Sequence, residues 1–531
     1  MAMTSAKDSL RTEERILDKK PFIGLAGIIV AAMSAEFNDQ VGSSAMVDVR
    51  GALGIGHDPG IWIESLYLSG MVIGMALSPC WSAAVTLRRT VLFAIAFNCL
   101  STALLPLAPN ETCFFVLRAA QGLAHGLTIP LLMTAALRFL APQIRLYGLA
   151  CYALTATFFP NLSAAVSALW TDVVGWRFVF ADAIPLCTIA ALCVWYGVPQ
   201  DPPNYQRLRK YDWPGTLLVI VGLGALTTML QHGSRLDWFD SKFICTLALV
   251  SAIAIPLLIV NECRQELPLF RPQLLKRRNF AYGVFTLFCF VIVGMSGSAI
   301  PSGYLIEVQG LRPLQTWSIM AEIAALQLVF LPLVVKLLDV EWIDSRWING
   351  LGLLCLIAAC VGSSQLDSTW SREQFYLWQA ISGFGQACVV LSLLMMATNA
   401  LVPQEGPFAS SLVNMPRGLS EVLGACILEL MSRFRGQLHS TRLLESAGTR
   451  RFSVIQASGI DVQHLPPLLP AGVPRSADSL ATFAHAIDVQ SAVMVISDDY
   501  LLLAGIAAII FAVLLVLPQR TWPPRIALLK K

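Results

Sequence analysis

The part of the sequence best able to do chemistry is LRAAQGLAHGLTIP, residues 117–130, where polar side chains interrupt an apolar run. Arg118, Gln121 and His125 follow one another at spacings of three and four, which places them on one face of a helix. A guanidinium at membrane depth is costly unless it faces a polar interior that supplies partners. This face therefore predicts a functional role, and a structural pin between two helices is the alternative interpretation of Arg118.

Two carboxylates in the first apolar run are candidates for carrying protons. Glu36 and Asp39 are three residues apart and so share one helical face. An acid that is protonated from one side and released to the other couples ion flow to transport. We expect Arg118 to hold one of these acids ionised in part of the cycle. In the alternative interpretation, the membrane-spanning helix formed by this first apolar run ends near Phe37, and both acids lie in a loop on the outer side of the membrane.

Further charged residues lie in apolar runs of the second half of the chain. Glu322 stands well inside IMAEIAALQLVFLP and is a candidate for coupling or gating. Arg417 and Glu421 are four apart, so they form either a structural ion pair or part of a site. The side chains that we expect to line a substrate cavity are Trp62, Tyr67, Gln121, His125 and Tyr304.

His125 has two interpretations. A single histidine in an apolar helix is more often a hydrogen-bonded core residue than a proton relay or ligand. No second His or Cys stands at helical spacing from it, so a metal site has no support. The sequence also has no Gly-rich phosphate loop, which argues against ATP as the energy source.

Composition determines the class of protein that must position these groups. The chain has 531 residues, of which 56% are hydrophobic and 13% charged. A soluble fold could not hide so much apolar surface, so we predict an all-α polytopic membrane protein. The net charge of +3 gives no indication of nucleic acid. The thirteen cysteines stand singly in or beside apolar runs, which is typical of small core residues.

Apolar stretches long enough to cross a membrane number fourteen. They are 22–46, 61–83, 91–108, 113–139, 147–169, 178–198, 213–231, 243–260, 280–303, 315–337, 347–363, 377–400, 409–431 and 500–518. With the N-terminus inside, inner segments hold 23 Lys and Arg and the short outer loops six. This asymmetry predicts that both termini are cytoplasmic.

The longest polar segment, Ser432–Asp499, falls on the outer side in this topology. RGQLHSTRLLES can form an amphipathic helix, whereas the prolines of LPPLLPAGVPR prevent one from continuing. We predict a partly helical outer lobe that is either a partner-docking surface or a tether.

Six sequence elements in order resemble the major facilitator superfamily, specifically its fourteen-span drug:proton antiporters of the EmrB/QacA type. R-x-x-Q-G-x-x-x-G is matched by Arg118, Gln121, Gly122 and Gly126, followed by Pro130. The other five are IWIESLYLSG with Trp62, Tyr67 and Leu68, WRFVFADAIP with Trp176, Arg177 and Pro185, DWPGTLLVIVGLGALTTMLQHGSRLDWF, LFRPQLLKRRNFAYG, and NMPRGLSEVLG at Asn414–Gly424.

The resemblance implies two six-helix halves, two inserted helices, and a cavity that opens to alternate sides. The expected parts are a cytoplasmic N-terminus 1–21, a first half 22–200, an inserted pair 201–265, a second half 266–519 containing the outer loop 432–499, and a tail 520–531. It also implies proton-driven efflux of amphipathic toxic compounds across an inner membrane, with no cofactor other than the proton gradient, and a periplasmic adaptor protein as a possible partner.

The chain departs from the family pattern in three places. LSPCWSAAVTLRRT keeps Arg88 and Arg89 but lacks the acid and glycines of the usual loop between spans two and three. The span-five motif G-P-x-L-G-G is reduced to a segment with Phe159 in place of the first glycine and Pro160 retained. In span one the acid Asp39 stands one position later than in the family. These differences leave open an exporter or facilitator of one metabolite; a membrane enzyme or sensor lacks an evident catalytic constellation.

Overall fold

The computed structural model describes residues 19–517 apart from 45, 140–144, 176–179, 203–210, 266–267, 341, 400, 402–404 and 450–476. Within these residues the chain is helical and has no strand. The long helices are α2 Lys19–Ser44, α4 His57–Val85, α5 Leu87–Leu104, α6 Glu111–Phe139, α7 Arg145–Val174, α9 Ala183–Gly197, α11 Trp213–His232, α12 Lys242–Arg264, α13 Arg278–Gly294, α15 Pro313–Leu338, α16 Ser345–Ser363, α17 Arg372–Asn399, α18 Gly406–Thr449 and α20 Ala477–Val516. Short helices are α3 Met46–Leu53, α14 Ala299–Glu307, η1 Leu105–Leu107, η2 Phe180–Asp182, η3 Trp238–Asp240 and η4 Pro272–Lys276.

Among the described residues, each of the fourteen predicted spans contains at least one helix. In the described part of the chain, twelve helical stretches are long and apolar enough to cross a membrane. The remaining two predicted spans fall on α9, which has only 15 residues, and on α18, which is not among the twelve. The fold is therefore that of an all-α polytopic membrane protein.

The ninth predicted span, 280–303, is interrupted. Helix α13 ends at Gly294 and α14 begins at Ala299, with a turn between them. Gly294 and Gly297 flank Ser296 there, and glycine is the weakest helix former after proline. The apolar pattern continues through this turn, which is why hydropathy alone predicts one continuous helix.

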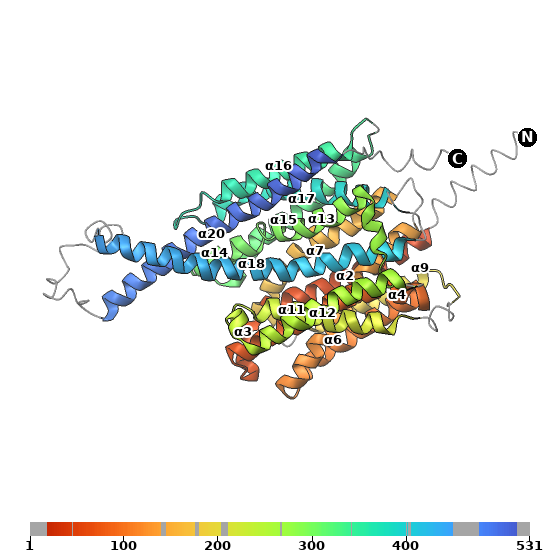
Figure 1. The fold of residues 1–531 in the computed structure, drawn as a ribbon, viewed down its shortest axis with the longest axis horizontal. Coiled ribbons are helices and arrows are strands. Elements are labelled where there is room, and N and C mark those ends of the chain that lie inside the picture. The colour runs from red at the N-terminus through yellow and green to blue at the C-terminus, as the bar shows by residue number, and fades with distance from the viewer. Residues whose placement is uncertain are drawn as a thin grey trace, which may run out of the picture.

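The helices form two groups (Figure 1). Helices α2, α4, α5, α6, α7 and α9 pack together, and α13, α15, α16, α17, α18 and α20 form the second group. Contacts between the groups run through α7 against α15 and α17, and through α18 against α4 and α6. Helices α11 and α12 pair with each other, and α11 lies against both α4 and α18.

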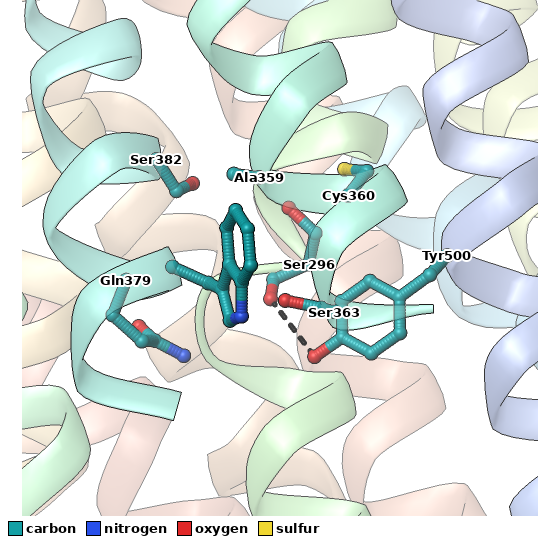
Figure 2. Close-up of a pocket in the computed structure, with 8 residues that line it drawn as sticks. Ser296, Ala359, Cys360, Ser363, Gln379, Ser382 and Tyr500 are labelled. Carbon is teal, nitrogen blue, oxygen red and sulfur yellow. Dashed lines mark hydrogen bonds between the residues drawn. The ribbon is translucent and has the colours of Figure 1, made fainter. Parts of the chain in front are cut away.

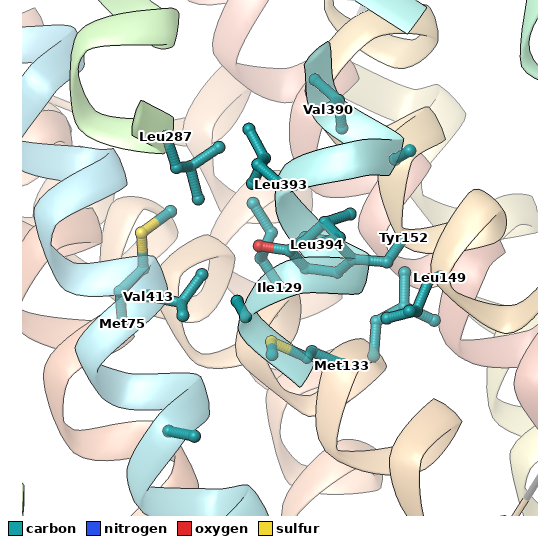
Figure 3. Packing of buried hydrophobic residues seen from close by; sticks show 14 of the residues in the cluster. Met75, Ile129, Met133, Leu149, Tyr152, Leu287, Val390, Leu393, Leu394 and Val413 are labelled. Carbon is teal, nitrogen blue, oxygen red and sulfur yellow. The ribbon is translucent and has the colours of Figure 1, made fainter. Parts of the chain in front are cut away.

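Buried apolar side chains join the two groups, as Figure 3 shows. Those from α4, α6 and α7 are Met75, Ile129, Met133, Leu149 and Tyr152, and those from α13, α17 and α18 are Leu287, Val390, Leu393, Leu394 and Val413. The Ser410 hydroxyl also donates to the carbonyl oxygen of Pro130 across this contact, at 2.8 Å. Most of these residues lie toward the C-terminal ends of α4, α6 and α17 and toward the N-terminal ends of α7 and α18, so apolar packing closes the contact between the groups at that end of the bundle.

Helices α18 and α20 project together beyond the rest of the bundle (Figure 1). Helix α18 has 44 residues, which makes it about 66 Å long, roughly twice the hydrocarbon thickness of a bilayer. The Asp498 carboxylate accepts hydrogen bonds from Arg435 and His439, each at 2.7 Å. The predicted helix RGQLHSTRLLES is confirmed as part of α18, and LPPLLPAGVPR lies outside the described residues.

Candidate functional site

Glycines bring together the two helices that carry most of the site. A Cβ atom at Gly122 of α6 would lie 2.0 Å from the carbonyl oxygen of Tyr67 on α4, and one at Gly126 would lie 2.0 Å from that of Met71. On α4, a Cβ at Gly70 would lie 2.6 Å from a carbonyl oxygen of α6. Only small residues allow backbones this close. The two motif glycines thus allow a close approach of α4 and α6, and this approach places Tyr67 beside the polar face of α6.

The Arg118 guanidinium lies inside the bundle, where only 1% of the residue is exposed. Its Nη1 donates to Gln121 Oε1 at 2.6 Å and to the backbone carbonyl oxygen of Asn38 on α2 at 3.3 Å. Its Cζ lies 4.3 Å from the centre of the Tyr67 ring, a cation–π contact. None of the described carboxylates forms an ion pair with it within 4.0 Å, so a direct bond that would hold Asp39 ionised is not present in this conformation.

Glu36 and Asp39 both lie within helix α2, which continues to Ser44. The alternative that they belong to an outer loop is therefore wrong: the helix runs past them for more than a full turn. Glu36 is buried, whereas Asp39 is partly exposed. The charged groups that act on Asp39 are Glu36 of its own helix, His125 and Arg118 of α6, and Glu421 of α18.

His125 lies between Tyr67 and Glu36. Its Nδ1 is 2.6 Å from the Tyr67 hydroxyl, and its Nε2 is 3.5 Å from a Glu36 carboxylate oxygen. The residue is 2% exposed. The interpretation of His125 as a hydrogen-bonded buried residue is thus correct for Nδ1, while Nε2 faces a carboxylate without a full hydrogen bond.

The second group of helices contributes Arg417 and Glu421 of α18. Arg417 Nε lies 3.8 Å from Glu421 Oε1, so the predicted ion pair exists. Arg417 also crosses to α7, where it donates to the carbonyl oxygen of Thr155 at 2.8 Å. Glu421 in turn interacts electrostatically with Glu36 and His125 of the first group. The polar cluster therefore spans both groups of helices.

Other predicted residues lie outside this cluster. Trp62 stacks on His232 of α11 with ring centres 4.2 Å apart, and Tyr304 donates to the carbonyl oxygen of Asp367 at 2.5 Å. Glu322 lies in α15, and one of its carboxylate oxygens is buried without a hydrogen-bond partner among the described residues. Pro130 and Pro160 stand inside α6 and α7. Of the matched motif elements, Trp176 and Arg177 lie outside the described residues.

Several functional candidates were missed at the sequence level. Glu64 of α4 is exposed and interacts with Arg118. It lies three residues before Tyr67, so helical spacing could have found it. Asn38 and Thr102 complete the polar lining, because Gln121 donates to the Thr102 hydroxyl at 3.0 Å and Asn38 does so at 3.3 Å. Asn38 and Thr102 are short and uncharged, so neither stands out in the apolar stretch of sequence that contains it.

A small polar pocket lies among α16, α17, α20 and the α13–α14 turn (Figure 2). It is lined by Ser296, Ala359, Cys360, Ser363, Trp378, Gln379, Ser382 and Tyr500. The Tyr500 hydroxyl donates to the carbonyl oxygen of Ser296 at 3.5 Å. None of the residues of the Arg118 cluster lines this pocket, so it is separate from that cluster.

A family profile described as Major Facilitator Superfamily matches residues 28–425. The chain belongs to the major facilitator superfamily. The family and fold are those of membrane transporters. The match includes most of the first group, the second group as far as the first part of α18, and the whole Arg118 cluster from Glu36 to Glu421.

Curated relatives within the superfamily are similar over most of their length. "Probable multidrug resistance protein EmrY" of Escherichia coli strain K12 is 25% identical over 415 residues, covering 78% of this chain and 80% of that protein. "Multidrug export protein EmrB" of the same strain is 26% identical over 446 residues, covering 81% and 84%. "Fatty acid resistance protein FarB" of Neisseria gonorrhoeae is 26% identical over 415 residues, covering 76% and 79%.

Solved structures agree on the major facilitator fold. A POT family transporter in complex with thioalcohol conjugated peptide has a TM-score of 0.58 at 14% identity, covering 93% of this chain and 95% of that one. The human organic anion transporter MFSD10 has a TM-score of 0.55 at 11% identity, covering 92% and 99%. At these identities the likeness concerns the fold alone.

Proposed function

We propose that this major facilitator protein is a proton-driven exporter of amphipathic toxic compounds across an inner membrane, with both termini in the cytoplasm. The observation that carries the proposal is the charge cluster in which Asp39 of one helix group is influenced by Glu421 of the other. Protonation of one acid changes the electrostatics across the contact between the groups, which is what coupling requires. The names of the relatives EmrY, EmrB and FarB support amphipathic or toxic substrates.

The chemistry of the cycle follows from where the charges lie. A proton arriving from the outer side neutralises Asp39 or Glu36 and removes a negative charge beside Arg118 and Arg417. The neutral acid attracts the buried cations less, and the two helix groups favour a different arrangement in which substrate leaves. The apolar seal of Figure 3 prevents protons from leaking to the inner side before that change.

The test replaces Asp39 with Asn, which keeps the size of the side chain and removes its charge. Purified protein in liposomes is loaded with ethidium as an amphipathic cation, and in parallel with dodecanoate as an amphipathic anion. Under an imposed proton gradient, Asp39→Asn should lose gradient-driven movement of the transported probe. Asp488→Asn on the exposed part of α20 is the matched control and should transport normally. Normal gradient-driven efflux by Asp39→Asn would overturn the proposal.

We also propose that the projecting pair α18 and α20 contacts an adaptor protein on the outer side. Its exposed side chains include Leu444, which is 51% exposed. A photo-crosslinking amino acid at position 444 should capture a periplasmic adaptor in cells, while the same group at Leu249, an exposed apolar position of α12, should not. Equal capture at both positions, or none at 444, would argue against this contact.

Export of one defined metabolite is the second candidate. It is favoured by the span-five segment, where the family glycine is replaced by Phe159, a buried side chain on α7. A bulky residue there prevents the close helix approach that glycine allows. Gradient-driven movement of a single organic acid, with neither amphipathic probe transported, would select this function.

A further inference from the structure

The contacts of His125 are those of a group that holds a proton in one state and not in another. Tyr67 Oη lies 2.6 Å from His125 Nδ1 and also 3.3 Å from the backbone carbonyl oxygen of Ala35. The hydroxyl has one hydrogen and two acceptors within reach. Its hydrogen can therefore turn from one acceptor to the other without any movement of heavy atoms.

Each protonation state of the imidazole has a complete hydrogen-bond pattern on that side. In the neutral ring, the Tyr67 hydroxyl donates to Nδ1, and the hydrogen of the ring is on Nε2, facing Glu36. In the charged ring, Nδ1–H donates to the Tyr67 oxygen, and the hydroxyl hydrogen turns to the Ala35 carbonyl. Neither state leaves a buried group on the Tyr67 side without a partner.

The other side of the ring is not arranged as a fixed structural bond. Nε2 lies 3.5 Å from Glu36 Oε2, beyond ordinary hydrogen-bond geometry, and has no hydrogen-bond partner among the described residues. A buried core histidine normally satisfies both nitrogens. The gap is one that a small movement of α2 or of the Glu36 side chain closes when the imidazole is charged.

The charged and titratable groups that act on this ring come from both groups of helices. Helix α2 supplies Glu36 and Asp39, and α18 of the second helix group supplies Glu421. Tyr67 of α4 makes the direct contact, and the Arg118 guanidinium of α6 lies over the Tyr67 ring. Three acids thus act electrostatically on one imidazole, and one of them belongs to the opposite group of helices.

We propose that His125 is a proton carrier of the transport cycle, which shares its proton with Glu36 and uses the Tyr67 hydroxyl as its switching partner. The proton that enters binds Nδ1, the Tyr67 hydrogen moves from Nδ1 to the Ala35 carbonyl, and Nε2–H bonds to ionised Glu36. Release reverses these movements. No other reactant is needed. The inference rests on the proposed proton-coupled export and adds a residue that changes charge near neutral pH.

The first test observes the ring without any substrate. The full chain is labelled with ¹⁵N-histidine, reconstituted in lipid nanodiscs and titrated between about pH 5 and pH 9. It has six histidines, and His125→Gln identifies the signal of interest. That signal should change from one protonated nitrogen to two within this range. Tyr67→Phe, which keeps the ring beneath Arg118 and removes the switching hydroxyl, should shift the midpoint by about half to one pH unit.

The second test measures the pH profile of gradient-driven ethidium or dodecanoate transport. His125→Gln should lose the pH-dependent step of transport near neutrality, whereas His232→Gln, at an equally buried histidine of α11, should keep the wild-type profile. A His125 signal that does not titrate overturns the inference and leaves the proposed export intact. Gradient-driven transport by Asp39→Asn overturns the export proposal, and the nanodisc titration remains decisive for His125.

Discussion

The Arg417 guanidinium of α18 donates to the backbone carbonyl oxygen of Thr155 on α7 at 2.8 Å, and so joins the two groups of helices. A backbone carbonyl oxygen does not titrate and is not removed by side-chain substitution, so its capacity to accept this bond does not depend on the protonation of the nearby acids. This contact also leaves the arginine able to pair with Glu421 on its own helix. Arg417 therefore combines a bond to the other group of helices with a titratable pair within its own helix.

Arg417→Gln should destabilise the protein and abolish transport. Removing one partner of a buried charged contact typically costs about 3–5 kcal/mol; here we expect about 2–3 kcal/mol, because Glu421 is 29% exposed and water compensates part of the loss. Thermal unfolding in detergent measures the change. Arg433→Gln on the same helix, whose partner Asp237 is 61% exposed, is the control and should change stability by less than about 1 kcal/mol. Equal effects of the two variants would contradict this account.

Gly126→Ala should separate α6 from α4. The new Cβ would lie 2.0 Å from the Met71 carbonyl oxygen, so the backbones must move apart, at a cost of about 1–3 kcal/mol or more. The movement also withdraws Tyr67 from His125, and transport should fall with stability. Gly505→Ala on α20, where nothing lies within 4 Å of the new Cβ, should be neutral in the same thermal unfolding assay. A fully stable and active Gly126→Ala protein would show that the helices are not held at this distance.

Asp498→Asn should loosen the projecting pair of helices. Asp498 accepts from both Arg435 and His439, so the loss of its charge weakens two contacts between α18 and α20 together. We expect amide hydrogen exchange over residues 435–446 to become about tenfold faster. Asp488→Asn, at an exposed position of the same helix, should leave exchange unchanged. Unaltered exchange in Asp498→Asn would mean that apolar packing alone holds the pair.

The loop after α16 should lose order in acid. The backbone N–H and the hydroxyl of Thr369 both donate to the Asp367 carboxylate and lower its pKa from the usual 3.8. A group whose pKa is lower in the folded state stabilises it above the usual pKa, and this contribution disappears as the pH falls through the folded value. Thr369→Val should raise the Asp367 pKa toward its usual value. A ¹³C titration of the carboxyl carbon checks this, and an unchanged pKa in the variant would contradict it.

Local properties of the sequence determined the class of the protein and one face of its site. Apolar runs of sufficient length predict membrane helices because hydrophobicity acts segment by segment. Helical periodicity places Arg118, Gln121 and His125 together, and a glycine every fourth residue predicts close packing. The prediction was less accurate for 280–303, where two glycines interrupt a run that remains apolar, and for 432–499, where helices continue far beyond the apolar core.

Tertiary structure alone decided the partners. Arg118 donates to the backbone carbonyl oxygen of Asn38, 80 positions away in the sequence. Because every residue has a backbone carbonyl, no pattern of side chains predicts this contact. Glu36 meets His125, and Glu421 reaches both from the opposite group of helices, because helix packing sets which faces meet. A buried charged residue can link two helices, form an ion pair or carry a proton. Which of these it does depends on the distances to its partners, and those distances exist only in the folded chain.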